Sequence, residues 1–137
     1  ILGICLGMQL LLDESEEFGL TSGLGLIPGR VVPISPLYNE RKKLTVPHIG
    51  WSALHINNVI SKPKHNLYEY VNDGNEVYFI HSFMASLKDD KHCIAYCYYG
   101  GLTIPAIIAK EKIMGCQFHP EKSGEIGSNV IKSFLSF

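Results

Sequence analysis

The sequence predicts a single domain of the α/β class, with helices on the faces of a sheet. Two observations lead to this prediction: short β-branched and apolar runs recur along the chain, and segments of helical composition or spacing follow the first run and close the chain. The 137 residues, 46% of them hydrophobic, are enough to bury one core. No internal repeat or long linker interrupts them, so we expect one domain over residues 1–137.

The N-terminal segment is predicted to form a strand, a sharp turn and a helix. The strand is the apolar run Ile1–Ile4. The helix is expected over Leu6–Glu17, which is rich in Leu, Met, Gln and Glu and contains no Pro. Phe18 and Gly19 should end it, because Gly is frequent just past the end of a helix.

The rest of the chain is predicted to consist of short strands separated by Pro, Gly and Asn, with one or two helical turns at Asn66–Val71. Apolar residues at helical spacing predict a last helix over Ser128–Phe137 that packs on the core. The expected strands are Arg30–Ile34, Leu44–Val46, Trp51–Ile56, Glu76–His81, Cys93–Tyr99, Ile104–Ala109 and Ile113–Phe118.

Composition excludes several classes of function. Lys and Arg number 12 against 13 Asp and Glu, so nothing in the charge favours a nucleic-acid partner. The apolar runs are shorter than the ~18 residues of a membrane span, and no signal peptide is recognised. The four cysteines lack a repeated close spacing, which favours a reducing cytoplasm.

No metal or nucleotide cofactor is expected. Cys93 and Cys97 share a face of a predicted strand near His92, which would allow a metal pair, but core packing is the better interpretation. No other Cys or His spacing completes a zinc site, and no Gly-rich phosphate loop with a Lys follows a strand.

A nucleophile elbow between strand and helix is indicated by Gly3-Ile4-Cys5-Leu6-Gly7. We expect both glycines to relieve crowding at the turn, and the start of the helix to lower the pKa of the thiol. The Leu6 N–H could then donate to an oxyanion formed beside the sulfur. The other interpretation, a cysteine that is merely a small buried hydrophobe, stays open on this motif alone.

A base and its orienting acid are indicated by His119-Pro120-Glu121, which follows the last predicted strand. Residues two apart in an extended segment point to the same side about 6 to 7 Å apart, so His119 and Glu121 can interact. With Cys5 they would form a Cys–His–Glu triad. His81 also ends a strand and is the alternative base.

These two motifs, Gly3–Gln9 and Phe118–Ser123, resemble the signature motifs of class I glutamine amidotransferases. Within that family, Gly23–Gly29, Pro47–Trp51 and Tyr78–Ser82 resemble segments of the glutaminase subunits of imidazole glycerol phosphate synthases. The resemblance extends over nearly the whole chain. It implies a flavodoxin-like sheet flanked by helices, and it gives His119 rather than His81 the role of base.

The resemblance also implies roles for residues that the motifs alone would leave unassigned. Gln9 and Glu17, at the two ends of the predicted helix, would hold the polar end of glutamine, with help from Leu6 and from the Ser82 and Phe83 backbone. A docking surface for a partner subunit would include His48, Trp51, Tyr78 and Lys122. The alternative for Trp51 is a place in the core.

The implied reaction is hydrolysis of L-glutamine to glutamate and ammonia. The resemblance implies a heterodimer in which ammonia passes to a (β/α)8-barrel subunit that makes imidazole glycerol phosphate and aminoimidazole carboxamide ribonucleotide in histidine biosynthesis. Members of the family carry further N-terminal strands and a Gly-rich loop with part of the oxyanion hole, so the chain is expected to be the C-terminal two-thirds of the domain, without full activity alone.

Three alternatives remain open from the sequence. A paralogous amidotransferase could deliver ammonia to another synthase, such as one that modifies a surface sugar. A γ-glutamyl peptidase would use Cys5 and His119 without a partner, but Gln9, Glu17 and Pro47–Trp51 argue against it. A non-catalytic binding or regulatory subunit would keep the fold and lose the chemistry.

Overall fold

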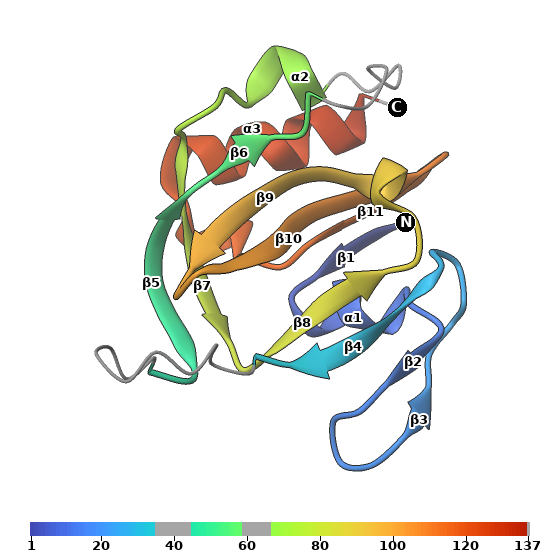
Figure 1. The fold of residues 1–137 in the computed structure, drawn as a ribbon. Helices are drawn as coiled ribbons and strands as arrows, with labels where there is room; N and C mark the ends of the chain where they lie inside the picture. Colours follow the sequence, from blue (N-terminus) through green and yellow to red (C-terminus); the bar gives the residue numbers. More distant parts are fainter. Residues whose placement is uncertain (35–44, 59–66, 137) are drawn as a thin grey trace.

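A computed structural model describes residues 1–34, 45–58 and 67–136 (Figure 1). Its elements, in chain order, are β1 (Leu2–Ile4), α1 (Leu6–Leu10), β2 (Glu14–Ser15), β3 (Thr21–Ser22), β4 (Gly29–Pro33), β5 (His48–Ala53), β6 (His55–Ile56), α2 (Leu67–Tyr70), β7 (Glu76–His81), β8 (Phe83–Leu87), η1 (Asp90–His92), β9 (Cys93–Tyr99), β10 (Leu102–Lys110), β11 (Ile113–Cys116), η2 (Pro120–Lys122) and α3 (Gly124–Leu135). The predicted residues Leu44, Asn66 and Phe137 lie outside this description.

The described strands form three sheets. The central sheet has the order β1-β11-β10-β9-β6, a second has the order β3-β2-β4-β8, and β5 pairs with β7. Within the central sheet β1 runs parallel to β11, and the other neighbours are antiparallel. The parallel pair joins Ile4 to Cys116, so the carboxyl ends of β1 and β11 lie side by side at one edge.

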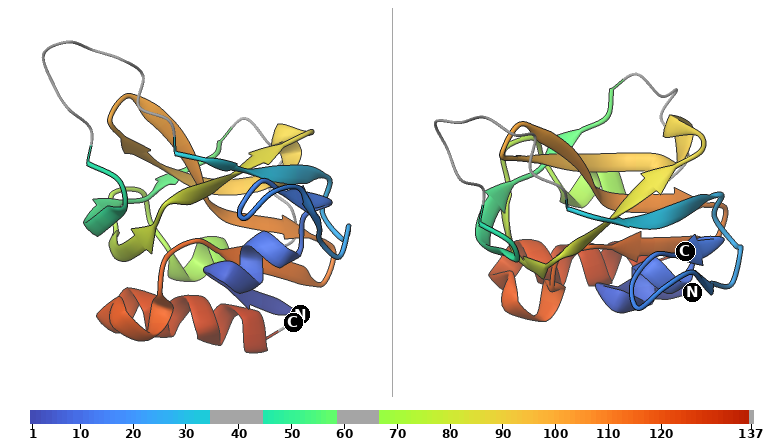
Figure 2. Two further views of the ribbon diagram at one scale, coloured as in Figure 1. Left: turned by 90° about the horizontal axis from the view of Figure 1, so that it is seen from below. Right: turned by 60° about the horizontal axis from the view of Figure 1, so that its bottom comes forward.

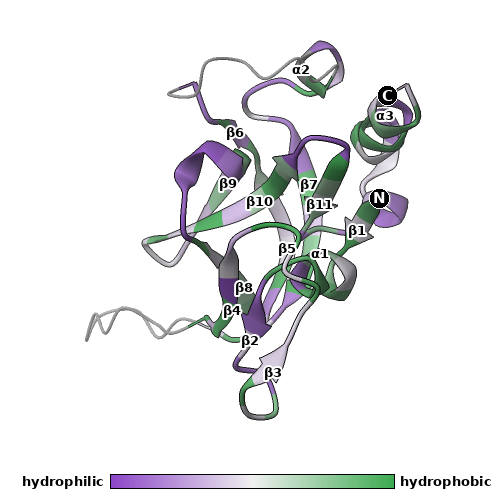
Figure 3. Cartoon of the chain, turned by 90° about the vertical axis from the view of Figure 1, so that its right-hand side faces the viewer, coloured by the Kyte–Doolittle hydropathy of each residue, from purple (hydrophilic) through white to green (hydrophobic). Residues whose placement is uncertain are grey.

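The central sheet is covered on both faces. Ile107 of β10 belongs to a core cluster with residues of α2, α3 and β7, whereas its neighbour Ile108 belongs to a second cluster with α1, β4 and β8. Figure 1 shows α3 on one side of β9 and β10 with β4 and β8 on the other, and in Figure 2 α3 runs along one side of the molecule. The hydrophobic stretches of α1, β10 and α3 appear in Figure 3. The α/β prediction is therefore confirmed, with a mostly antiparallel sheet.

The predicted helix Leu6–Glu17 is wrong beyond Leu10. The carbonyls that would continue it accept other bonds: that of Leu11 accepts the N–H groups of Leu26 and Ile27, and that of Leu12 accepts the N–H of Gly25. These tertiary bonds override a favourable helix composition. The chain then forms β2, which pairs with β3 and β4.

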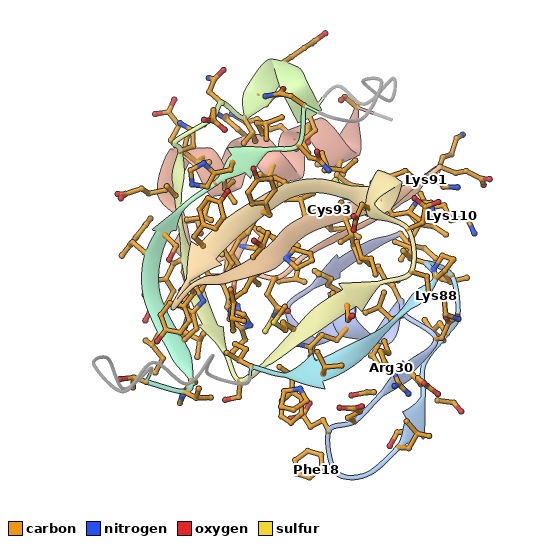
Figure 4. All side chains as sticks on the ribbon, viewed as in Figure 1. Phe18, Arg30, Lys88, Lys91, Cys93 and Lys110 are labelled. Carbon is orange, nitrogen blue, oxygen red and sulfur yellow. The ribbon has the colours of Figure 1, made fainter. Side chains whose placement is uncertain are left out.

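Other differences from the predicted elements are smaller. Thr45 and Val46 lie outside the strands, and Trp51–Ile56 is divided between β5, which begins earlier at His48, and β6. Strand β8 and the β2–β3 hairpin were not predicted. The tip of that hairpin carries Phe18, which is 98% exposed and points away from the sheets in Figure 4.

Several basic side chains are paired with acids on the surface. Lys88, which Figure 4 places at the same end of the molecule as Lys91 and Lys110, lies 3.0 Å from the Asp13 carboxylate. The same carboxylate oxygen accepts the Gly29 N–H at 3.0 Å, and these two bonds lower the pKa of Asp13. No helix among the described residues is long and apolar enough to cross a membrane.

Candidate active site

Cys5 occupies a strained turn between β1 and α1. Its backbone has φ 51° and ψ −107°, a region that non-glycine residues rarely adopt, and its N–H donates to Cys116 O at 2.8 Å. The turn directs the chain from the sheet edge straight into the helix. The predicted strand, sharp turn and helix are thus confirmed, although the helix has one turn and a half.

The two glycines of the elbow differ in their surroundings. A Cβ on Gly3 would lie 2.5 Å from Gly7 O and 2.7 Å from Met8 N, so only glycine allows the first turn of α1 to cross β1 this closely. A Cβ on Gly7 would meet no described atom within 4 Å. The expectation that both relieve crowding is right for Gly3 and wrong for Gly7.

The Cys5 sulfur is half-buried and makes weak polar contacts. It lies 3.7 Å from Ile80 O, to which a thiol donates, and 3.7 Å from the Gln117 amide nitrogen, which donates to it. Burial raises the pKa of the Cys5 thiol, although donation from the Leu6 N–H and from Gln117 opposes this. The expectation of a lowered pKa for Cys5 is therefore wrong. Desolvation of the thiolate outweighs the favourable effect of the N-terminus of α1, which has only five residues.

Alkylation of Cys5 by iodoacetamide, without substrate, is expected to become faster as the pH rises through and beyond 9.0, the ordinary thiol value. A raised pKa keeps the thiol protonated to higher pH, and only the thiolate reacts. Mass spectrometry of the Cys5 peptide, with the buried Cys93, Cys97 and Cys116 as references, measures the rate. A rate that levels off well below pH 9.0 would contradict this account.

His119 and Glu121 interact directly at the same sheet edge as Cys5. His119 Nδ1 lies 2.6 Å from a Glu121 carboxylate oxygen. The pKa of Glu121 is lowered, because its own backbone N–H and the imidazole together outweigh the effect of desolvation. The two residues meet because η2 turns the chain, and the expectation of one extended segment is wrong at this point.

Backbone and hydroxyl contacts fix the position of His119. Its N–H donates to Tyr78 O at 2.9 Å, and its carbonyl accepts the Ser123 hydroxyl at 2.7 Å. Ser123 Oγ also accepts the Tyr78 N–H at 3.0 Å. Two hydrogen bonds of the Tyr78 backbone therefore connect strand β7 to the segment that carries His119. The described hydrogen bonds of Cys5 Sγ go to Ile80 and Gln117, and none goes to His119. Proton transfer between Cys5 and His119 is part of the reaction proposed below.

The Gln9 side chain is buried inside the protein rather than exposed on the helix surface. Its amide nitrogen donates to Phe83 O at 3.1 Å and to Gln117 Oε1 at 3.2 Å, and the side chain is almost fully buried. The carbonyls of Phe83 and Ser82 are both occupied inside the protein, the latter by the Ile34 N–H. Gln117 was not predicted as part of the site, although a fully buried polar residue at the end of an apolar strand was its signal.

Glu17 does not lie at the end of α1, as expected, but in the turn after β2. Its charge nevertheless raises the pKa of Cys5, as does that of Glu121, so both carboxylates act on the sulfur. Leu6, the first residue of α1, has a 59% exposed side chain.

No group of three or more His, Cys, Asp or Glu side chains in the described ranges could hold a metal ion. Cys93 and Cys97 do share a face of β9, and both are buried in the core. Burial raises the pKa of each to about 12. Both thiols are therefore protonated at neutral pH and pack as small apolar groups in the core.

A family model matches the sequence over residues 1–136, and its description is Glutamine amidotransferase class-I. The chain belongs to the class I glutamine amidotransferase family. Both motifs of the site, the Cys5 elbow and the His119–Glu121 pair, lie within the matched residues.

Similar proteins within this amidotransferase family carry the name imidazole glycerol phosphate synthase subunit HisH. The protein of Lactococcus lactis subsp. lactis (strain IL1403) is 49% identical over 135 residues, which cover 98% of this chain and 61% of that protein. The protein of Geobacillus sp. (strain WCH70) is 46% identical over 136 residues, which cover 99% and 61%. The chain spans about three fifths of the length of these relatives.

Solved amidotransferase structures share the fold. A crystal structure of a glutamine amidotransferase superposes with a TM-score of 0.63 at 16% identity, covering 98% of this chain and 58% of that one. A glutamine amidotransferase from Thermotoga maritima gives a TM-score of 0.55 at 17% identity, covering 98% of this chain and 46% of the other. At these identities the likeness establishes the fold alone.

The residues expected on a docking surface separate into two groups in this amidotransferase chain. Trp51 is 54% exposed and packs edge to face on Tyr78 at 5.8 Å between ring centroids, so the alternative that Trp51 fills the core is wrong. Lys122 is also exposed. His48 lies in β5 rather than in a loop, and its side chain is only 2% exposed because it packs between Phe79 and Tyr99. A surface contact by the His48 side chain is therefore not available in this fold.

Proposed function

We propose that this protein is a glutaminase subunit that hydrolyses L-glutamine to glutamate and ammonia. Cys5 is the nucleophile, His119 the general base and acid, and Glu121 the group that orients the imidazole. The main support is the parallel pairing of β1 with β11, which brings the strained Cys5 elbow and the His119–Glu121 pair to one sheet edge.

Because the pKa of Cys5 is raised, the thiol needs a base to remove its proton, and we assign this role to His119. In the first step His119 takes the thiol proton as the sulfur attacks the side-chain carbonyl carbon of glutamine. His119 then gives this proton to the departing ammonia, which leaves a γ-glutamyl thioester on Cys5. In the second step it activates water against the thioester, and glutamate and the free thiol are released. Catalytic hydrogen bonds of this kind often form only in the substrate complex.

The neighbouring groups suit the charges that develop. The Leu6 N–H already acts on the sulfur of Cys5, and is placed to donate to the oxyanion of the tetrahedral intermediate. We assign Glu17 to the α-ammonium group of the substrate, since its charge acts at the nucleophile. We assign the Gln9 side chain and the Ser82–Phe83 backbone to the border of the glutamine site, where internal hydrogen bonds hold them.

The same proposal includes a partner. Relatives at 49% and 46% identity are named as subunits of imidazole glycerol phosphate synthase. We place a (β/α)8-barrel synthase subunit against the exposed Trp51 and Lys122 side chains and the half-buried Tyr78 beside them, where it receives ammonia to make imidazole glycerol phosphate and aminoimidazole carboxamide ribonucleotide. Four unpaired cysteines accord with the reducing cytoplasm as the compartment.

The glutamine analogue 6-diazo-5-oxonorleucine tests the catalytic assignment. We expect it to alkylate Cys5 covalently in the presence of the barrel subunit, with L-glutamine protecting, because the reagent needs both the thiolate and the substrate site. Mass spectrometry locates the adduct, and the buried Cys116 serves as an internal control. A protein that iodoacetamide alkylates at Cys5 but that stays inert to this analogue would favour a non-catalytic subunit instead.

A further inference from the structure

Two buried histidines outside the proposed triad face each other across the β5–β7 pair. His48 and His81 are register partners, and each is at most 5% exposed. His48 Nδ1 lies 2.8 Å from His81 Nε2. On the far side His48 Nε2 lies 3.0 Å from Ser52 Oγ, and His81 Nδ1 lies 2.8 Å from Phe83 O.

When both imidazoles are neutral, the chemistry of these contacts fixes the direction of every bond. A carbonyl oxygen only accepts, so His81 carries its proton on Nδ1 and donates to Phe83. Neutral His81 then accepts at Nε2, which requires His48 to donate from Nδ1. His48 in turn accepts at Nε2, so the Ser52 hydroxyl is the donor at the outer end. Both imidazoles are neutral in this arrangement.

The same row of bonds continues to the nucleophile. The Phe83 carbonyl accepts from His81 and also from the Gln9 amide, which donates to Gln117 Oε1. The opposite end of the Gln117 amide donates to Cys5 Sγ at 3.7 Å. The orientation of the Gln117 amide is thereby set, because its oxygen is taken by Gln9 and only its nitrogen is left for the sulfur.

We infer that His81, supported by His48, is a positioning residue for the glutaminase site: its Nδ1–H holds the Phe83 carbonyl and so aligns Gln9 and Gln117 for donation to the Cys5 sulfur. The inference rests on the proposed function. It also gives β5 a physical connection to the nucleophile, since the strand that carries the exposed Trp51 carries both Ser52 and His48.

The surroundings keep this row neutral. His48 stacks on Phe79 and Tyr99, with ring centroids 4.8 and 4.0 Å away, and His81 is the only titratable group among the described residues that shifts its pKa. Burial, with a smaller effect of His81, lowers the pKa of His48 to about 4. Burial also lowers the pKa of His81; the bond to the Phe83 carbonyl opposes this, and the positive charge of a protonated His119 adds to it, so the net shift is downward. The donor directions therefore persist at neutral pH.

Two conservative replacements of His81 separate positioning from general stability. The amide nitrogen of Asn can take the place of Nδ1 and keep the bond to Phe83, whereas that of Gln takes the place of Nε2 and loses it. The readout is the rate of Cys5 alkylation by iodoacetamide against pH, which needs neither glutamine nor a partner. It therefore remains informative if the glutaminase proposal fails. His92→Gln is the matched control, because buried His92 makes the same kind of bond to Ala109 O at 3.1 Å away from the site.

His81→Gln is expected to slow alkylation at neutral pH by about threefold to tenfold, the effect of one hydrogen bond on the thiolate, with an unchanged rate at the alkaline plateau. His81→Asn and His92→Gln are expected to react like the unmodified protein. Equal rates for His81→Asn and His81→Gln would overturn the inference. An equal loss in His92→Gln would overturn it as well, since the effect would then be one of general stability.

Discussion

Replacing His119 with Asn is expected to lower kcat for glutamate formation by about 10²- to 10⁴-fold, with a smaller change in KM. The Cys5 thiol is held protonated by burial, so without a base it seldom reaches the thiolate that attacks glutamine. Asn keeps a polar group near the place of Nδ1, which contacts Glu121, and removes proton transfer. Steady-state glutamate release, measured with the barrel subunit present, gives both constants.

His55→Asn is the matched control for this replacement. His55 stacks on Tyr96 at 5.7 Å and lies 4.0 Å from Asp73, outside the site, so its loss should leave kcat unchanged. If His119→Asn retained full activity while a His81 variant that keeps the Phe83 bond lost it, the base would be His81, the alternative that the sequence left open.

Replacing Gly3 with Ala is expected to destabilise the fold strongly at the elbow that carries Cys5. The added methyl group would lie 2.5 Å from Gly7 O and 2.7 Å from Met8 N, and neither backbone atom can move without moving α1 off β1. Overpacking of this kind costs about 1–3 kcal/mol, and more where backbone must shift. The urea midpoint of unfolding measures the loss, and alkylation of Cys5 shows whether the elbow survives.

Gly7→Ala provides the matched control four residues along. No described atom lies within 4 Å of its new methyl group, and Ala is favoured over Gly inside a helix by about 0.8–1 kcal/mol. We therefore expect equal or greater stability. A Gly3→Ala protein as stable as Gly7→Ala would show that the contact between β1 and α1 is looser than described.

The sequence predicted most accurately the strands whose own residues are strongly β-prone. Strand β9 has the predicted bounds Cys93–Tyr99, since it forms a hairpin with β10 and its residues are β-prone. Strand β8 was missed because nothing in Phe83–Leu87 alternates between apolar and polar residues, and its partner β4 lies at least 50 residues earlier. The overlong first helix failed for the same reason, as the bonds that end it come from residues 25–27.

The candidate site was predictable where a motif carries the chemistry. Cys5, His119 and Glu121 could be named because their spacing and their place after strands are local features. The pKa of Cys5 could not, because burial is a property of the assembled fold. The row from His48 through His81 to Gln9 and Gln117 also required the structure, since it joins four separate segments of the chain.

The central claim, that Cys5 hydrolyses glutamine for a synthase partner, is tested most directly by one assay. Glutamate released from glutamine is measured for the protein with and without the cognate (β/α)8-barrel subunit, and for Cys5→Ala under both conditions. We predict release that depends on the partner and is abolished in Cys5→Ala. Release that persists in Cys5→Ala, or no release from the unmodified protein with its partner, would contradict the account.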